Sequence, residues 1–490
     1  MNTPLRKVGV AMLVMVTLLL VNATYIQVVK ADDYRSDGHN SRVLLDEYSR
    51  QRGTIAASES GQVLAAVEST DDKFKFLRTY PGGATYAPVT GFYSIRYGAH
   101  GLERAMDEVL NGSDPRLFVR RLSDMITGRD PRGGNVRVSI RPSVQEAAYN
   151  AMTRRGYKGA VVALDPKTGD ILAMVSTPSY DPNRLASHDG KEQETAWTEL
   201  NKNPNKPMLN RAIQETYPPG STFKLVVTAA ALENGAGPDT PVTNAAEVQL
   251  PGTRGADLEN FGHQTCPGST LKDALAYSCN TAYAELAASL GKEKLTETAA
   301  NFGIGQTDLY IPMRVATSVL GPMSSPAELY QTGIGQRDVR LTPLQDALLS
   351  ATIANGGVAM KPRLVKSLLA QDMSEMEEFR PEELTGDPAM SRANATILTD
   401  MMIASEANTK GGGKRADLKI ASKTGTAEHG TDPKATPPHA WYTAFAPADD
   451  PKVAIAVIVE SGGNRGLAAT GGTVAAEVGR ATIAAALGGG

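Results

Sequence analysis

The chain has 490 residues, of which 41% are hydrophobic and 21% charged, so it can bury a sizeable core and is not a disordered chain. Its 50 Lys and Arg residues nearly balance its 53 Asp and Glu residues, which excludes a nucleic-acid-binding scaffold held by phosphate contacts. A mean hydropathy of −0.24 excludes a protein with many membrane spans. The 2 cysteines and 6 histidines form neither a CxxC pair nor an HExxH motif, so we expect no metal site.

A single apolar segment near the N-terminus, Val8 to Ile26, contains no charged residue. As a helix its roughly 19 residues would span about 28 Å, the thickness of the hydrocarbon core of a bilayer. Arg6 and Lys7 precede it, so the positive-inside rule places the N-terminus in the cytoplasm. We predict a single-pass protein of the cell membrane, with residues 1–30 as cytoplasmic tip and anchor and the rest outside. The alternatives are a cleaved signal peptide or a buried core helix.

Residues 31–140 mix polar turns with short periodic segments. The patterns at 52–55 and 61–65 indicate strands, and those at 102–110 and 116–125 indicate amphipathic helices. The stretch GRDPRGG at 128–134 is rich in helix and strand breakers, which marks a boundary. We therefore predict a separate N-terminal domain over residues 31–140.

Residues 141–490 have the pattern of a larger α/β (α+β) domain. A helix is predicted at 142–155, followed by a β-hairpin, AVVALDP and DILAMVS, around the turn at 167–169. Further helices are predicted at 221–233, 271–290, 343–355 and 473–487, and further strands at 418–422, 440–446 and 453–460. Strands at both ends of a helical middle predict one sheet whose first and last strands meet, covered by helices.

Three short patterns with chemical meaning occur in order: S-x-x-K at Ser221, S-x-N at Ser278 and K-T-G at Lys423. Ser221 follows Pro-Pro-Gly and opens an apolar helix, whose free N–H groups favour developing negative charge. Lys224 lies one turn further on the same face, where burial near another cation would let it act as a base toward the serine. The alternative is a capping serine with a surface lysine.

The K-T-G pattern lies inside a predicted strand. Gly425 stands where a strand prefers a β-branched residue, as expected if a ligand or another backbone approaches closely. Thr424 and Thr426 point to the same side, and with the cation of Lys423 they suit a carboxylate ligand. Ser278 and the amide of Asn280 could face the same cleft from a tight loop between helices.

Two of these patterns occur a second time. The K-T-G copy at 167–169 lies in the predicted hairpin, where Gly169 supplies a positive φ. The S-x-x-K copy at Ser269 opens a helix that Thr270 and Asp273 are placed to cap. Both copies are therefore predicted to be structural.

Together the three patterns are the signature of penicillin-binding proteins and class A β-lactamases. The chain resembles a class B penicillin-binding protein, a monofunctional peptidoglycan DD-transpeptidase, and looks most like the actinobacterial penicillin-binding protein A type. The likeness includes RGTI at 52–55, GQVLA at 61–65, GAVVALDPKTGDILAMVSTPSYDPN at 159–183, NRAIQETYPPGSTFK at 210–224, GIGQ at 333–336, LTPLQ at 341–345 and KTGTAE at 423–428. It implies a serine DD-transpeptidase/β-lactamase-like fold: a central antiparallel sheet covered by helices, a helical subdomain and an N-terminal pedestal domain.

The resemblance implies acyl transfer from D-Ala-D-Ala stem peptides without metal or cofactor. Ser221 would be the nucleophile, Lys224 its base, and the backbone N–H groups of Ser221 and Thr426 the oxyanion hole. Ser278, between Lys224 and Lys423, would pass a proton to the leaving D-Ala. Substrate, or a β-lactam acting as covalent inhibitor, would be bound by Lys423, Asn280, Thr424, Gly425 and Thr426.

The resemblance also implies partners and leaves alternatives. Peptidoglycan stem peptides and their lipid-linked precursor would be substrates, and cell-division or elongation proteins would bind the N-terminal domain. A DD-carboxypeptidase, which gives the acyl group to water, would carry the same residues, and a scaffold role stays open. A β-lactamase is disfavoured by the anchor and by the absence of a Glu-x-x-x-Asn pattern after the S-x-N motif, and a bifunctional enzyme by the short N-terminal segment.

The two cysteines, Cys266 and Cys279, lie outside the membrane in this topology. They could form a disulfide that tethers the loop of Ser278, or remain two small buried thiols.

Overall fold

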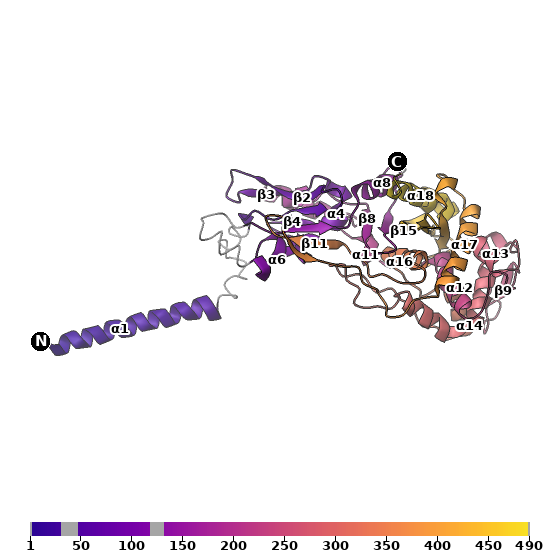
Figure 1. Cartoon of the computed structure of the whole chain (residues 1–490), viewed down its shortest axis with the longest axis horizontal. Coiled ribbons are helices and arrows are strands. Elements are labelled where there is room, and N and C mark those ends of the chain that lie inside the picture. Colours follow the sequence, from indigo (N-terminus) through magenta and orange to yellow (C-terminus); the bar gives the residue numbers. More distant parts are fainter. Residues whose placement is uncertain (1, 31–47, 118–131, 489–490) are drawn as a thin grey trace.

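The computed structural model describes residues 2–30, 48–117 and 132–488. Helix α1 (Asn2–Thr24) continues as a π-helical turn over Tyr25–Val29 and projects away from the folded body (Figure 1). The segment Thr3–Val29 is long and apolar enough to cross a membrane. None of its most apolar stretch is buried against the rest of the described chain. The predicted span therefore lies within a helix suited to anchor the protein in a bilayer.

A six-stranded sheet forms the end of the body toward α1 (Figure 1). Its strands are β1 (Ile55–Ala57), β2 (Val63–Ser69), β3 (Phe76–Thr79), β6 (Asn135–Val138), β11 (Val365–Leu369) and β12 (Glu375–Glu378), in the order β12-β11-β6-β1-β2-β3. β1 pairs with β6 in parallel, and the other neighbours are antiparallel. Two strands from the C-terminal half of the chain thus complete a sheet that begins in the N-terminal part.

Short elements connect these strands. They are α4 (Ala87–Thr90), β4 (Phe92–Ser94), β5 (Gly98–His100), α5 (Leu102–Ala105) and α6 (Asp107–Leu110). The predicted helix at 102–110 is divided into α5 and α6, because the dihedral angles of Met106, φ −112° and ψ 23°, are not helical. The predicted helix at 116–125 falls largely outside the described residues.

A buried charge network holds the N-terminal sheet to α5. Glu103 is fully buried and accepts hydrogen bonds from Arg52 Nε and Arg78 Nε, each at 2.6 Å. The hydroxyl of Tyr80 donates to the same carboxylate at 3.1 Å. Glu103 therefore pairs with two buried guanidinium groups, of which Arg52 also pairs with Asp107 at 2.6 Å. Removal of Glu103 would leave Arg78 buried without its ion-pair partner.

The C-terminal part contains a five-stranded antiparallel sheet in the order β13-β14-β15-β7-β8. Its strands are β7 (Gly159–Leu164), β8 (Ile171–Thr177), β13 (Ala421–Ala427), β14 (His439–Ala446) and β15 (Val453–Val459). Because β7 is hydrogen-bonded to β15, the first and last strands meet as predicted. Strand β13, which carries the K-T-G motif, lies at the edge of the sheet.

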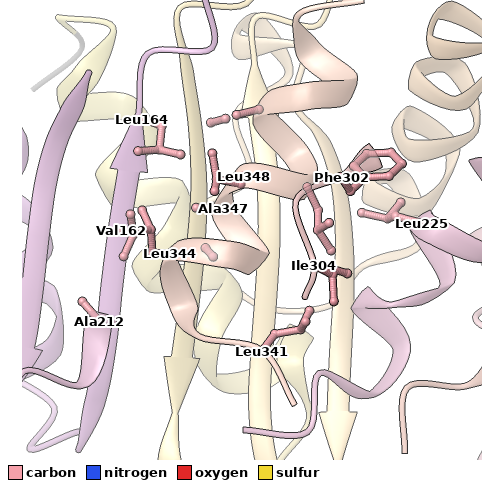
Figure 2. Packing of buried hydrophobic residues seen from close by; sticks show 14 of the residues in the cluster. Val162, Leu164, Ala212, Leu225, Phe302, Ile304, Leu341, Leu344, Ala347 and Leu348 are labelled. Atoms are coloured by element: carbon pink, nitrogen blue, oxygen red, sulfur yellow. The ribbon is translucent and has the colours of Figure 1, made fainter. Parts of the chain in front are cut away.

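Helices cover both faces of this sheet. One face packs against α8 (Pro142–Thr153) and α18 (Ala476–Ala486), and the other against α11 (Arg211–Gln214), α12 (Lys224–Glu233) and α16 (Pro343–Ala354). Figure 2 shows the second layer, where Leu344 and Leu348 of α16 pack toward Val162 and Leu164 of β7. The same apolar cluster extends to Ile55 of β1, so both sheets share one core.

A helical layer lies at the end of the body far from α1 (Figure 1). It contains α13 (Leu271–Ala276), α14 (Asn280–Asn301) and α17 (Arg392–Asn408), and α15 (Pro326–Gly333) packs on α14. The predicted single helix at 271–290 is interrupted, because Ser278 has a φ of 61°, which no right-handed helix accommodates. This interruption places Ser278 and Cys279 between α13 and α14, with Asn280 as the first residue of α14.

The strand that carries K-T-G begins three residues later than predicted. Residues Ala416–Leu418 form a 3-10 turn, and Lys419 has a left-handed φ of 43° that ends it. The strand therefore starts at Ala421 and contains the whole motif.

We predict that Glu103→Ala lowers the free energy of unfolding by about 3–5 kcal/mol, because it leaves Arg78 buried without its ion-pair partner and Arg52 with only its pair to Asp107. Urea unfolding of the full-length protein in detergent, followed by circular dichroism, measures this. Glu194→Ala is the control, since its pair with Arg96 (3.1 Å) is exposed on both sides and is worth about 0–1 kcal/mol. Equal effects of the two substitutions would contradict the role assigned to the network.

Candidate active site

Ser221 lies in a 3-10 turn, Gly220–Thr222, directly before α12. The sequence predicts a helix from Ser221 onward, but the α-helix starts at Lys224, and the turn positions the serine just outside it. Ser221 is half-buried, whereas the helix that follows is buried along nearly its whole length. The serine is thus presented at a boundary between core and solvent.

The turn packs directly on the edge strand β13. A Cβ at Gly220, whose φ is 55°, would lie 2.8 Å from the carbonyl oxygen of Thr426. A Cβ at Gly425 would lie 2.7 Å from the carbonyl oxygen of Pro219 and 3.1 Å from Thr222 Cγ2. The expectation that another backbone approaches Gly425 is confirmed, and it is the turn of the serine that does so.

Two further hydrogen bonds hold this turn. Trp441 Nε1 donates to the carbonyl oxygen of Pro218 at 2.9 Å, and the N–H of Gly220 donates to the carbonyl oxygen of Gly335 at 2.9 Å. The turn is therefore fixed both to the sheet and to the GIGQ loop at 333–336.

The hydroxyl of Ser278 lies between the side-chain nitrogens of two lysines. Its Oγ is 2.9 Å from Lys423 Nζ and 3.4 Å from Lys224 Nζ. Lys224 Nζ also donates to the carbonyl oxygen of Ser278 and to Asn280 Oδ1, both at 2.8 Å. The structure thus brings together residues from all three motifs, which are far apart in the sequence.

Both lysines are buried, and burial changes their protonation. Burial lowers the pKa of Lys224 well below 10.5, and the charge of Lys423 lowers it further. Burial lowers the pKa of Lys423 from 10.5 to about 7. Lys224 is therefore the group more suited to accept a proton at neutral pH.

The ring of Tyr283, which the sequence analysis missed, lies under Lys224. Lys224 Nζ is 5.2 Å from the ring centroid, a distance at which the ring favours the charged amine. The hydroxyls of Tyr283 and Thr228 are 2.7 Å apart, and Thr228 donates to the carbonyl oxygen of Lys224. In the sequence, the one feature that could have pointed to Tyr283 is an aromatic residue three positions after Asn280. A tyrosine at that spacing is equally typical of a residue that only packs in the core.

Not every predicted pair is in contact. Among the described residues no hydrogen bond joins Ser221 Oγ to Lys224 Nζ, because the lysine donates to Ser278 and Asn280. Alternation along β13 places Thr424 and Thr426 on the half-buried face and Lys423 on the buried one. Lys423 Nζ accordingly meets Ser278 and the carbonyl oxygen of Thr424, at 2.9 Å each.

Cys266 and Cys279 form a disulfide, with their Cα atoms 5.8 Å apart. It ties the turn of Ser278 to the segment that follows β10 (Asp257–Glu259). Asn280 Nδ2 donates to the carbonyl oxygen of Glu259 at 3.0 Å, so the S-x-N motif is also held to the end of β10.

The second copies of the motifs are structural, as predicted. Gly169 has a φ of 74° in the hairpin turn, and Lys167 pairs with the exposed Asp450. Thr270 and Asp273 form a capping box at the start of α13.

Comparison with known families agrees with this geometry. The family described as "Penicillin binding protein transpeptidase domain" matches residues 159–484, and "Penicillin binding protein A dimerisation domain" matches residues 52–136. The chain therefore belongs to the transpeptidase family of penicillin-binding proteins.

Within this family the chain is similar to the penicillin-binding protein A type, which confirms the resemblance noted in the sequence. It is 57% identical to the peptidoglycan D,D-transpeptidase PbpA of Mycolicibacterium smegmatis and 52% identical to that of Mycobacterium tuberculosis, over 99% of both chains in each case. The ceftriaxone acyl-enzyme of penicillin-binding protein A from M. tuberculosis superimposes with a TM-score of 0.88 at 52% identity, covering 90% of this chain and 100% of that one. The penicillin G acyl-enzyme of the same protein superimposes with a TM-score of 0.85 at 52% identity, covering 89% of this chain and 100% of that one.

We predict that Lys423→Met abolishes acylation by a fluorescent penicillin yet raises the free energy of unfolding at pH 7 by about 1–4 kcal/mol, because it removes a buried cation. The pKa of Lys423 is lower in the folded protein, so the folded state holds fewer protons than the unfolded state between about pH 7 and pH 10.5. The free energy of unfolding of the wild type therefore rises with pH over this range. The difference in free energy of unfolding between Lys423→Met and wild type should accordingly become smaller.

Thermal unfolding at about pH 7 and about pH 10 checks this. Lys419→Met is the matched control, because Lys419 is 63% exposed and its removal should change little. A loss of stability in Lys423→Met would mean that the lysine supports the fold.

Proposed function

We propose that this protein is a peptidoglycan D,D-transpeptidase. It forms a seryl acyl-enzyme with D-Ala-D-Ala stem peptides and transfers the acyl group to an amine of a neighbouring stem peptide, which cross-links the cell wall. The observation that carries the proposal is Ser278 Oγ between Lys224 Nζ at 3.4 Å and Lys423 Nζ at 2.9 Å, beside the turn of Ser221. The names of the full-length relatives and the β-lactam acyl-enzymes of penicillin-binding protein A support it.

In the acylation step Ser221 Oγ attacks the carbonyl carbon of the penultimate D-Ala. A C–O bond forms, the seryl proton moves to neutral Lys224 Nζ, and the carbonyl oxygen becomes an oxyanion. The backbone N–H groups of Ser221 and Thr426 would donate to this oxyanion. The position of β13 at the edge of its sheet supports this role, since its outer side is not covered by another strand.

Collapse of the oxyanion breaks the peptide C–N bond and leaves an ester on Ser221. The leaving amine of D-Ala takes a proton that passes from Lys224 through the Ser278 hydroxyl. An amine of a second stem peptide then attacks the ester, and its proton returns to Ser221 Oγ as the new amide forms. This sequence of steps needs neither a metal nor a cofactor.

Substrate would be held on both sides of the serine. The terminal carboxylate of the stem peptide, or the carboxylate of a β-lactam, would be bound by Lys423, Thr424 and Thr426, with Gly425 admitting the close approach. Asn280 would bind the amide of the stem peptide. A β-lactam acylates Ser221 through its ring carbonyl, and the resulting ester blocks the site.

The chain would be organised as a membrane anchor (1–30), a non-catalytic N-terminal domain (31–140) and a transpeptidase domain (141–490). The N-terminus would lie in the cytoplasm and the catalytic domain outside, as Arg6 and Lys7 indicate. The N-terminal domain would bind cell-division or elongation proteins, and the catalytic domain the lipid-linked precursor.

We predict that the full-length protein in detergent gains the mass of one benzylpenicillin, and that Ser221→Ala gains none. Intact-mass spectrometry measures both. The adduct should persist for hours, because the site is built to give the acyl group to an amine; rapid loss would indicate a β-lactamase. An adduct on Ser221→Ala would place the nucleophile elsewhere.

An assay of the same protein with a stem-peptide substrate distinguishes a transpeptidase from a carboxypeptidase. Transfer to an added amine acceptor supports the transpeptidase, whereas release of free acid at the same rate with and without acceptor indicates a carboxypeptidase. No adduct and no turnover would favour the scaffold role.

For the topology, we predict that a membrane-impermeant fluorescent penicillin labels the protein in right-side-out vesicles without detergent. In inside-out vesicles labelling should require detergent, because Ser221 would then face the lumen. Ser221→Ala supplies the background. Labelling of intact inside-out vesicles would reverse the proposed orientation.

A further inference from the structure

A π-helical turn, Gly471–Ala475, leads into α18 and lies against β13, the strand of K-T-G. The backbone N–H of Gly471 donates a hydrogen bond to Thr426 Oγ1 at 3.4 Å. Thr426 is one of the residues proposed above to bind the substrate carboxylate, whereas no step of the mechanism uses this turn. A segment 45 residues further along the chain therefore contacts that part of the site.

Gly471 packs directly on the backbone of the sheet. A Cβ at this position would lie 2.1 Å from the carbonyl oxygen of Trp441 and 2.7 Å from that of Gly425. Trp441 of β14 and Gly425 of β13 are partners in the register of the two strands, at the glycine of K-T-G. The Gly471 N–H can reach Thr426 because no side chain stands between the turn and the sheet.

Two threonines close the turn around Gly471. The N–H of Thr470 donates to Thr473 Oγ1 at 2.9 Å, and the N–H of Thr473 donates to Thr470 Oγ1 at 3.3 Å. This reciprocal pair is a capping box. Thr473 Oγ1 also donates to the carbonyl oxygen of Thr470 at 3.1 Å. Loss of either hydroxyl would therefore loosen the turn that carries the Gly471 N–H.

The glycine run at 411–413 supports the same turn from its other side. A Cβ at Gly411 would lie 2.1 Å from the carbonyl oxygen of Gly472, so the two backbones are in direct contact. Arg480 of α18 donates from Nη1 to the carbonyl oxygens of Gly411 and Gly412, at 3.0 and 2.8 Å. Its side chain is 0% exposed. A sequence that would be flexible as an isolated linker is thus fixed beneath the turn.

The bond from Gly471 decides what the Thr426 hydroxyl can offer a ligand. A hydroxyl has one proton to donate and two lone pairs to accept. The N–H of Gly471 occupies a lone pair, and among the described residues no acceptor takes the proton. Because Thr426 lies on the half-buried face of β13, that proton is available to a carboxylate oxygen in the cleft. Without the N–H, the hydroxyl could turn its lone pairs toward the carboxylate, which would repel them.

We propose that the capping box around Gly471 holds its N–H on Thr426 Oγ1, so that the Thr426 hydroxyl donates its proton to the carboxylate of a stem peptide or a β-lactam. Thr470 and Thr473 are positioning residues, because they act on the ligand only through Gly471 and Thr426. The proposal rests on the proposed function, since it concerns how the carboxylate of that function's substrate is bound.

The test compares the second-order rates at which benzylpenicillin and its methyl ester, which lacks the carboxylate, acylate the full-length protein in detergent. Thr470→Val removes one half of the capping box at similar volume, so the ratio of the two rates should fall about three- to ten-fold from its wild-type value. Thr470→Ser keeps the hydroxyl and should restore the wild-type ratio. A general loss of folded protein would slow both compounds alike and leave the ratio unchanged.

A double-mutant cycle shows whether the effect passes through Thr426. Thr426→Val removes the hydroxyl that Gly471 orients, so Thr470→Val should slow acylation by benzylpenicillin no further in this background. The cycle uses only the benzylpenicillin rates, so it decides the matter even where the ester reacts too slowly to measure. Thr473→Ala removes the other half of the box and should act as Thr470→Val does, which keeps the test available if one variant fails to fold.

Ser391→Ala is the matched control. Ser391 caps α17 by accepting a hydrogen bond from the N–H of Asn394 at 3.3 Å, the same length as the bond that Thr470 accepts. Its ratio of rates should follow wild type, and thermal unfolding reports the folding of each variant.

A wild-type ratio in both Thr470→Val and Thr473→Ala would overturn the proposal. An equal effect of Thr470→Val in wild type and in Thr426→Val would overturn it as well. A wild-type protein that gains no adduct on Ser221 would overturn the proposed function itself, and this outcome is distinct from an adduct whose rate does not depend on the capping box.

Discussion

The Gly220–Thr222 turn packs closely on the backbone of β13, and the positions of Ser221 and Lys224 relative to the sheet depend on this contact. A Cβ atom at Gly220 would lie only 2.8 Å from the nearest carbonyl oxygen, and one at Gly425 only 2.7 Å, so neither position has room for a side chain. Any residue larger than glycine would push α12 away from the sheet. Ser221 and Lys224 would then separate from Ser278 and Lys423, although none of these four side chains had changed.

This close packing also removes water from two lysines that lie near each other. Their hydrogen-bond partners are neutral: hydroxyl, carbonyl and amide oxygens of Ser278, Asn280 and Thr424. No carboxylate among these partners cancels the positive charge that either lysine carries when it is protonated.

The N-terminal part is joined to the catalytic part by more than a linker. Strands β11 and β12 leave the catalytic part, pair with β6 and complete the N-terminal sheet. One apolar cluster runs through both sheets, and Glu103 with Arg52 and Arg78 fixes β1, β3 and α5 around it. The transpeptidase site is therefore carried on a body with a continuous core, and the N-terminal helix of the same chain is long and apolar enough to cross a membrane.

The sequence by itself determined the features that depend on near neighbours: the apolar anchor, the hairpin around Gly169, the capping box at Thr270 and the three motifs with their order. Tertiary structure decided the rest. The motifs meet across 145 residues between Ser278 and Lys423, and the break at Ser278 overrides a strong local helix pattern. The contact of Tyr283 with Lys224 was hidden for the same reason: burial and contact partners come from distant segments, and a local sequence pattern does not contain them.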